Sequence, residues 1–318
     1  MRPLKEIMEN ARRAGLVIPA FNIPHLPMVQ PVIQAVVDQN AFALLEVARL
    51  EWTKFESQSM AAVYEEFSRW SQPEHVRLHL DHIPVIDEDN QQVDYLACIR
   101  EAIALGYPSV MVDGSRLSLA ENIAATRQVV DVAHPAGVIV EAELGAILGH
   151  EAGPIPPYEE LFASGRGFTD VAECARFVAE SGCDTLSVAI GSIHGAVSGV
   201  LKDQPKVEAR LNLEHLERLH QAADIPLVLH GGSGIKRDYL LAAVQRGITK
   251  VNVGTEIRQA YETTRRQTPD IAAAQQAVYE RTVWLLRDYF PSPAAGRWST
   301  RLRSRPQITF LGREIGDW

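Results

Sequence analysis

Cysteine is scarce in this 318-residue chain, which contains only Cys98, Cys174 and Cys183 and no CxxC pair. So few cysteines exclude a disulfide scaffold and a zinc site built from thiolates. No apolar run reaches the roughly 18 residues that span a bilayer, and the N-terminal residues lack the apolar core of a signal peptide. We therefore expect a cytoplasmic protein with no membrane partner.

Positive charge is also in deficit, since 31 Lys and Arg residues face 40 Asp and Glu residues, for a net charge of −9. This balance argues against nucleic acid and anionic membrane surfaces as partners. Hydrophobic residues make up 46% of the chain, enough for a large core. Because no Gly- or Ser-rich linker interrupts the chain, we expect one domain over 1–290, followed by a tail over 291–318.

Short apolar strands alternate with amphipathic helices about eight times along the chain. The expected strands cover 16–21, 42–49, 76–81, 109–113, 138–145, 185–190, 225–229 and 250–253. Nearly continuous apolar strands are typical of a parallel sheet that is covered on both faces. The pattern predicts an α/β fold of the (β/α)₈ TIM-barrel class, with an open doubly wound sheet as the alternative. No GxGxxG motif follows the first strand, which weakens the dinucleotide-binding form of that alternative.

Polar side chains stand at the carboxyl ends of most expected strands, where an α/β barrel forms its site. They are Asn22, Asp81, His82, Asp113, Glu143, His194, His230 and Asn252. Neighbouring side chains of a strand point to opposite faces, so Asp81 and His82 diverge unless the strand twists as it ends. Three imidazoles that converge with one open position are typical of a catalytic zinc site.

Two further segments complete the expected site. The glycine-rich turn over 230–234 is suited to phosphate, because its backbone N–H groups and the start of the next helix face one point. A polar segment from 146 to about 167 contains Glu151 among glycines and three prolines. A loop of that length inside a compact domain indicates a lid or a disordered segment.

These motifs together resemble the class II, zinc-dependent fructose-bisphosphate and tagatose-bisphosphate aldolase family. The resemblance runs in order from about Pro19 to Phe290 and rests on the stretches 19–22, 78–82, 112–115, 121–123, 141–145, 188–195, 228–234 and 250–253. It implies reversible cleavage of a ketose phosphate to dihydroxyacetone phosphate and an aldehyde through a metal-stabilised enediolate. It also implies a homodimer or homotetramer.

The resemblance assigns roles residue by residue. Metal ligation is expected of His82, His194 and His230, with Asp113 and Glu143 at an alternative or second metal position. Proton transfer is expected of Asp81 and Glu151, and Asn252 contacts the substrate. Substrate and phosphate contacts are expected of Asn22, Gly195, Gly231, Gly232, Ser233, Gly254 and Thr255, with a possible monovalent cation nearby.

The chain departs from the family at four places: around Glu151, after Gly195, at the end of strand two, and at Gly254 after strand eight. Ser198 stands where the family has a phosphate-binding lysine, and strand two ends in Glu46-Val47-Ala48-Arg49 rather than in a small hydroxyl residue. Arg49 suits a substrate carboxylate if it faces the site, or it pairs with Glu46. The changes are either drift in a working sugar-bisphosphate aldolase or the mark of a changed substrate, and the second interpretation predicts poor cleavage of fructose 1,6-bisphosphate. Alternatives are a zinc-dependent lyase or isomerase acting on an unphosphorylated or carboxylated sugar, and a non-catalytic barrel that keeps the metal.

The tail over 291–318 combines apolar residues, among them Trp298, Phe310 and Trp318, with five arginines. So many apolar groups are unusual in a solvated tail, and we expect it to pack on protein, in particular on a neighbouring subunit.

Overall fold

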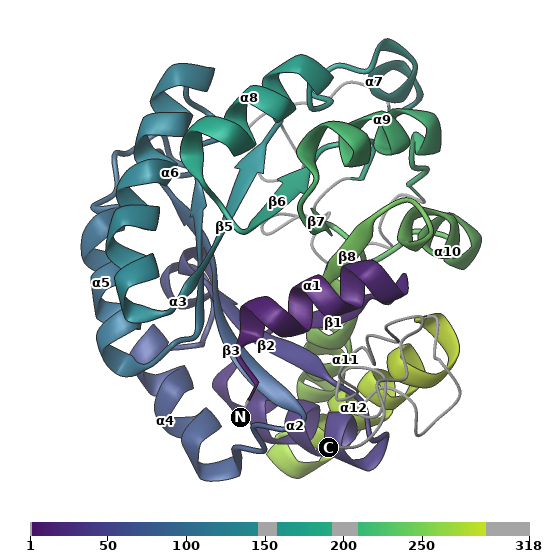
Figure 1. Ribbon diagram of the computed structural model, residues 1–318. Coiled ribbons are helices and arrows are strands. Elements are labelled where there is room, and N and C mark those ends of the chain that lie inside the picture. Colours follow the sequence, from purple (N-terminus) through teal and green to yellow (C-terminus); the bar gives the residue numbers. More distant parts are fainter. Residues whose placement is uncertain (1, 146–157, 193–208, 291–318) are drawn as a thin grey trace, which may run out of the picture.

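The eight strands of the chain form one closed parallel barrel in sequence order. The computed structural model describes residues 2–145, 158–192 and 209–290 (Figure 1). The strands are β1 (Ile18–Asn22), β2 (Ala43–Ala48), β3 (Val76–Pro84), β4 (Ser109–Asp113), β5 (Ile139–Leu144), β6 (Thr185–Val188), β7 (Leu227–Leu229) and β8 (Ile248–Val253). The predicted TIM barrel is thus confirmed, and the open sheet was the wrong alternative, because β8 pairs with β1.

Helices follow the strands and form the outer layer of the barrel. They are α1 (Leu4–Ala14), η1 (Leu26–Met28), α2 (Val29–Asp38), α3 (Arg49–Thr53), α4 (Met60–Trp70), α5 (Tyr95–Leu105), α6 (Leu119–Ala133), η2 (His134–Ala136), α7 (Tyr158–Ser164), α8 (Val171–Ser181), α9 (Leu213–Ala223), α10 (Arg237–Val244), α11 (Thr255–Gln267), α12 (Ile271–Trp284) and η4 (Leu285–Tyr289). In the residues that the structure describes, no helix is both long and apolar enough to cross a membrane.

Two short helices were not predicted. Arg49 begins α3 instead of ending a strand, and the Glu51 carboxylate accepts the Ala48 N–H at 2.8 Å there. Helix α7 occupies part of the segment predicted to be a loop, so that prediction was wrong for Tyr158–Ser164. Both helices are too short to show a clear helical period in the sequence, and prolines precede α7.

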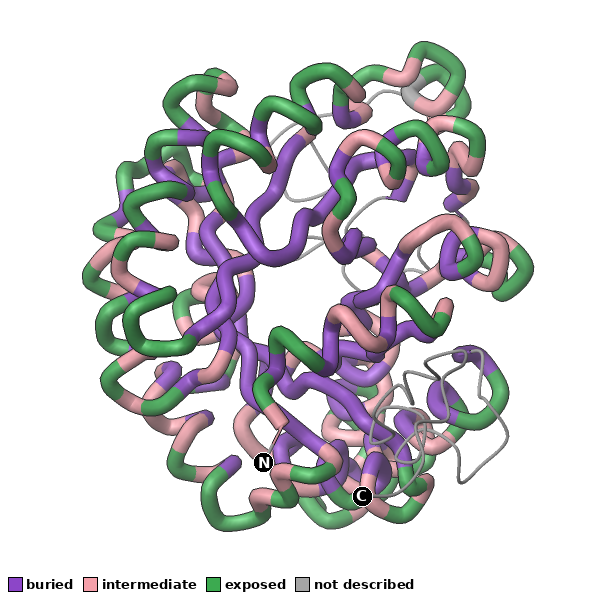
Figure 2. Tube along the Cα trace, in the orientation of Figure 1, coloured by how far each residue is buried: buried purple, intermediate pink, exposed green. Residues whose placement is uncertain are grey.

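The core is built from both faces of the strands, which are buried along nearly their whole length (Figure 2). Outward side chains such as Leu45, Leu78 and Val140 pack beneath the helices. Helix α1 lies across the barrel in Figure 1, where Leu4, Ile7 and Met8 join a second apolar cluster with strand-start residues such as Ile18 and Leu44. The end where the strands begin is thereby closed, which leaves the carboxyl end for a site.

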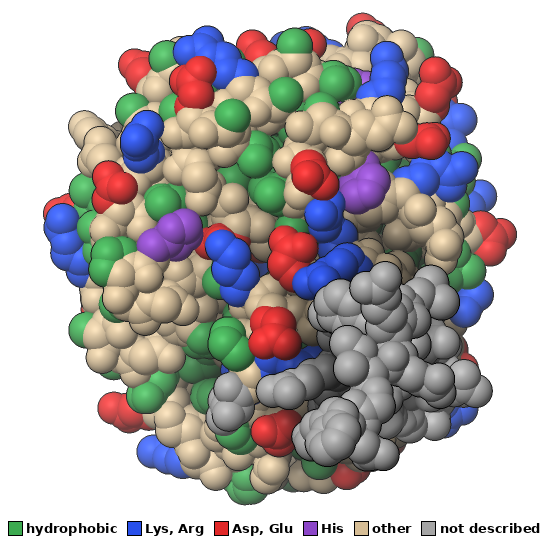
Figure 3. Space-filling model, in the orientation of Figure 1, with side chains coloured by type: hydrophobic (Ala, Val, Ile, Leu, Met, Phe, Trp, Pro, Cys, Tyr) green, Lys and Arg blue, Asp and Glu red, His purple; other side chains and the backbone are tan. Residues whose placement is uncertain are grey.

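The outer surface carries charges of both signs. Figure 3 shows acidic and basic side chains interspersed on the face that contains α1, with apolar side chains scattered among them.

Candidate active site

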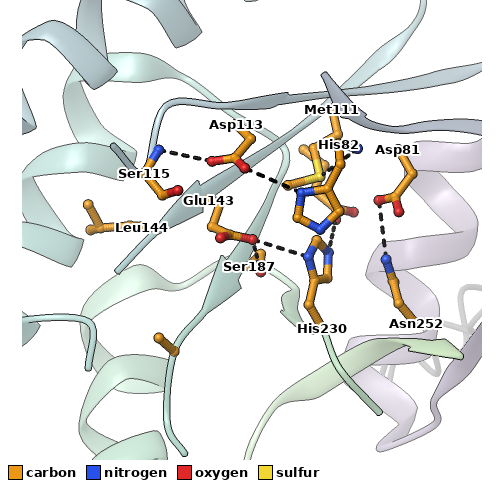
Figure 4. Close-up of polar contacts among 12 residues, drawn as sticks. Asp81, His82, Met111, Asp113, Ser115, Glu143, Leu144, Ser187, His230 and Asn252 are labelled. Atoms are coloured by element: carbon orange, nitrogen blue, oxygen red, sulfur yellow. Dashed lines mark hydrogen bonds and ion pairs between the residues drawn. The ribbon is translucent and has the colours of Figure 1, made fainter. Parts of the chain in front are cut away.

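The predicted strand-end residues do meet at the carboxyl end of the barrel. Figure 4 shows Asp81 and His82 from β3, Asp113 from β4, Glu143 from β5, His230 after β7 and Asn252 from β8 around one point. Of the predicted set, His194, Gly195 and Glu151 lie outside the described residues.

A bulge in β3 turns both Asp81 and His82 toward this point. The pairing of β3 with β4 shifts register between Leu80 and Ile83, and His82 has a φ of +36°. A positive φ is strained for a residue with a side chain, and such strain is common at functional sites. The strand continues to Pro84, so the two side chains converge because of the bulge and not because the strand ends.

His82 and His230, the two predicted histidine ligands of the metal within the described residues, lie against each other, with ring centroids 4.5 Å apart. The Nδ1 atom of His82 lies 3.4 Å from Asp113 Oδ2. His230 lies between two carboxylates, with Nε2 2.9 Å from Glu141 Oε1 and Nδ1 3.1 Å from Glu143 Oε2. Ligand atoms of Asp81, His82 and His230 all fall within 4.8 Å of one another, which is the spacing of a metal-binding group.

The electrostatics of this group favour a cation. Burial alone would lower the pKa of His82, but Asp81, Asp113 and Glu143 outweigh burial and raise it to about 10. Burial likewise opposes the charge of His230, whereas its contacts with Glu141 and Glu143 raise its pKa. Carboxylates that raise the pKa of both imidazoles in this way can also stabilise a metal ion, because metal binding releases any proton that the imidazoles hold.

Two amides hold the carboxylate of Asp81. Asn22 Nδ2 donates to Oδ2 at 2.9 Å, and Asn252 Nδ2 donates to Oδ1 at 3.2 Å. Burial would raise the pKa of Asp81, but the positive charge of His82 and the contact with His79 lower it well below its usual value. The group is therefore an oriented, ionised carboxylate that can accept a proton beside the candidate metal site.

The glycine-rich turn after His230 packs tightly against the end of β8. The Gly232 N–H donates to Asn252 O at 3.0 Å, and a Cβ at Gly232 would lie only 2.5 Å from Val251 Cγ1. Helix α11 begins at Thr255 with Gly254 at its N-cap and no side-chain cap. Helix α10, the next helix after the turn, begins only at Arg237. The helix whose start directly follows a strand is therefore α11, which comes after β8.

We expect Gly232→Ala to destabilise the protein by about 1–3 kcal/mol, the usual cost of overpacking a well-packed site. The variant should also raise KM, because the displaced backbone carries Asn252. Thermal unfolding and steady-state kinetics measure the two effects. Gly137→Ala is the control, since its Cβ would meet no atom within 4 Å. Any loss of stability in this variant comes from the positive φ of +72° and not from a clash. A Gly232→Ala protein as stable as the parent would contradict the expected clash.

Four charged or polar side chains below the mouth were missed as site residues. Glu46 of β2, His79 of β3, Glu141 of β5 and Lys250 of β8 point into the barrel and are at most 2% exposed. We call these four residues the inner layer. The sequence carried one signal for them, because each lies two residues before a strand-end position and therefore on the same strand face.

The contacts of the inner layer show that Glu46 and Arg49 of the second predicted strand do not pair with each other. Glu46 does not neutralise Arg49; it lies 3.2 Å from Lys250 Nζ. Arg49 Nη1 instead contacts Asp87 Oδ2 at 3.2 Å, and Asp87 also accepts the N–H groups of Asp89 and Gln91. The charge of Arg49 is thus balanced by Asp87, so we do not assign Arg49 to a substrate carboxylate.

Comparisons with known proteins agree with this geometry. Residues 2–290 match the profile of the family described as fructose-bisphosphate aldolase class-II. The chain is 33% identical over 295 residues to the 6-phospho-5-dehydro-2-deoxy-D-gluconate aldolase of Bacillus subtilis, covering 86% of this chain and 92% of that enzyme. It is 34% identical over 282 residues to a fructose-bisphosphate aldolase of Streptococcus pyogenes, covering 87% and 86%. Among solved structures, the YdjI aldolase of Escherichia coli matches with a TM-score of 0.69 and 25% identity, over 93% of this chain and 98% of that one.

Proposed function

Since the chain belongs to the class II fructose-bisphosphate aldolase family, we propose that it is a zinc-dependent aldolase that cleaves a phosphorylated ketose to dihydroxyacetone phosphate and an aldehyde. The observation that carries the proposal is the group formed by Asp81, His82 and His230 at the barrel mouth. His82 and His230 would ligate the metal together with His194, which lies outside the described residues, and Asp113 and Glu143 would form the alternative metal position. The crowding of carboxylates around two imidazoles fits a divalent cation.

Different side chains of the site carry out the two proton transfers of the proposed reaction. Asp81, held by Asn22 and Asn252, accepts the proton of the C4 hydroxyl as the carbon–carbon bond breaks. Glu151, which lies outside the described residues, is expected to move the C3 proton of dihydroxyacetone phosphate. Asn252 contacts the substrate on the side where negative charge develops. A divalent metal, when bound, supplies Lewis-acid stabilisation of that charge.

We propose that the phosphate of dihydroxyacetone phosphate binds to Gly195, Gly231, Gly232 and Ser233, with Gly254 and Thr255 at the start of α11. The Gly232 N–H donates to Asn252 O, but the other backbone N–H groups of the turn and a helix N-terminus favour a phosphate at this position of a barrel. Ser198 in place of lysine leaves this subsite with fewer charged contacts, which weakens binding because charge-assisted hydrogen bonds are about twice as strong as neutral ones. The subsite could also hold a monovalent cation.

The departures from the family bear on the rest of the substrate. Ala48 pairs in register with Asp81, so a strand-two hydroxyl is missing next to the proposed acid–base. We therefore expect poor cleavage of fructose 1,6-bisphosphate and tagatose 1,6-bisphosphate and better turnover of another phosphorylated ketose or keto acid. The relative from Bacillus subtilis, named for a phosphorylated gluconate derivative, makes that compound the first one to compare.

Steady-state kinetics of the zinc-loaded protein on these three compounds tests the proposal. Turnover of about 1–10³ per second on fructose 1,6-bisphosphate, which is ordinary for an enzyme on its own substrate, would show that the departures leave specificity unchanged. Zinc binding together with proton exchange of dihydroxyacetone phosphate tests the reaction class without knowledge of the aldehyde. A protein that binds zinc but exchanges no proton would favour a lyase or isomerase of another sugar.

A further inference from the structure

The inner layer connects β2 to the proposed metal ligand His230 through an unbroken series of contacts. Lys250 Nζ lies 3.0 Å from each carboxylate oxygen of Glu141. Glu141 Oε1 in turn lies 2.9 Å from Nε2 of His230. The remaining side of the Lys250 ammonium faces Glu46, whose Oε2 lies 3.2 Å away. Every member of this series is at most 2% exposed, so water cannot replace a lost contact.

Opposite charges attract each other within the inner layer. Burial would lower the pKa of Lys250 and raise that of Glu141, but their mutual attraction wins and both stay ionised. Burial and the nearby charge of Asp81 raise the pKa of Glu46 well above its usual value. Burial and Lys250 lower the pKa of His79. Lys250 and Glu141 therefore carry opposite charges, and in either protonation state Glu46 places a carboxyl oxygen against the Lys250 ammonium.

We propose that Glu46 is a positioning residue that acts on the metal site through Lys250, Glu141 and His230. An ammonium group has three donors, and two of them face Glu141. By its close contact with the remaining side of the ammonium, Glu46 holds Lys250 in place, which fixes the carboxylate of Glu141 and hence the orientation of the His230 ring. Partners that orient a histidine ligand in this way set the affinity for the metal. The inference rests on the metal site proposed above.

The affinity of the full-length protein for Zn²⁺, measured by competition with a chelating dye, tests this role. We expect Glu46→Leu to weaken Zn²⁺ binding by about tenfold or more, as is usual for lost outer partners of a ligand. Glu46→Gln keeps an accepting oxygen and should stay within about threefold of the parent protein. In a Lys250→Met background, Glu46→Leu should have little further effect, because the residue through which it acts is gone.

The matched control is Asp184→Asn, which removes a buried acid that contacts Lys5 Nζ at 2.7 Å outside the site. It should lower the thermal stability of the metal-free protein without changing Zn²⁺ affinity. If Glu46→Leu does not fold, the double variant Glu46→Leu/Lys250→Met replaces it, because it leaves no unpaired lysine. The Zn²⁺ affinity of this double variant is then compared with that of Lys250→Met alone.

Two results would overturn the inference: parent-like Zn²⁺ affinity in Glu46→Leu, or equal losses in the Leu and Gln variants. A parent protein that binds no Zn²⁺ would overturn the proposed metal site and this inference together. If the parent protein binds Zn²⁺ and His230→Ala loses it, but Glu46→Leu keeps the parent affinity, the metal site stands. Only the inference about Glu46 is then overturned.

Discussion

His230→Ala is expected to lose bound zinc and to reduce kcat/KM by more than about a hundredfold. This loss is larger than the roughly 10–100-fold that is usual when a residue supporting a metal ligand is replaced. His230 is fully buried between Glu141 and Glu143 and lies against His82, so its removal takes away the imidazole around which these groups are arranged. Its removal leaves His82 and Asp81 as the described members of the metal-binding group. Metal analysis of the purified protein after dialysis, together with kinetics at saturating zinc, measures both effects.

A histidine remote from the site serves as the control for this variant. His75 precedes β3 at the opposite end of the barrel, where its Nδ1 donates to Ala41 O at 2.8 Å. His75→Ala should keep the zinc content and the activity of the parent, at some loss of thermal stability. Full zinc occupancy in a folded His230→Ala protein would show that the metal is held elsewhere.

The barrel could be predicted from the sequence because its signals are local. Each strand is an apolar run bounded by turn residues, and helix ends carry their own marks. Asp170 accepts the N–H groups of Ala172 and Glu173 at the start of α8, and Gly182 ends that helix with a φ of +74°, as the sequence indicates. The ring of strand-end residues followed from the same reading, since all parallel strands end at one mouth.

The inner layer could not be predicted in the same way. Strands of a parallel barrel are buried on both faces, so alternation of residue type does not tell which face points inward. Lys250 and Glu141 lie 109 positions apart in the sequence, and only the closed barrel brings them to 3.0 Å. The turn of His82 toward the site likewise depends on a register shift against β4, which no local pattern records. The same holds for the pairing of Arg49 with Asp87.

Asp81→Asn should separate the two halves of the proposed reaction. Because the carboxylate accepts the C4 hydroxyl proton, cleavage should fall by about 10²–10⁴-fold, the usual contribution of a general base. Exchange of the C3 proton of dihydroxyacetone phosphate should persist, because that step has no C4 hydroxyl. Coupled assays of cleavage and NMR of exchange in deuterium oxide give the two rates on one preparation.

Loss of orientation is the competing explanation for such an effect, since an amide at position 81 would face the amides of Asn22 and Asn252. Asn22→Ala tests it, because this variant removes one of the two donors to Asp81 and keeps the carboxylate. If the carboxylate itself moves the proton, Asn22→Ala should reduce cleavage much less than Asp81→Asn does. Equal losses of cleavage in both variants, or a parallel loss of exchange in Asp81→Asn, would assign Asp81 to substrate positioning or metal binding instead of proton transfer.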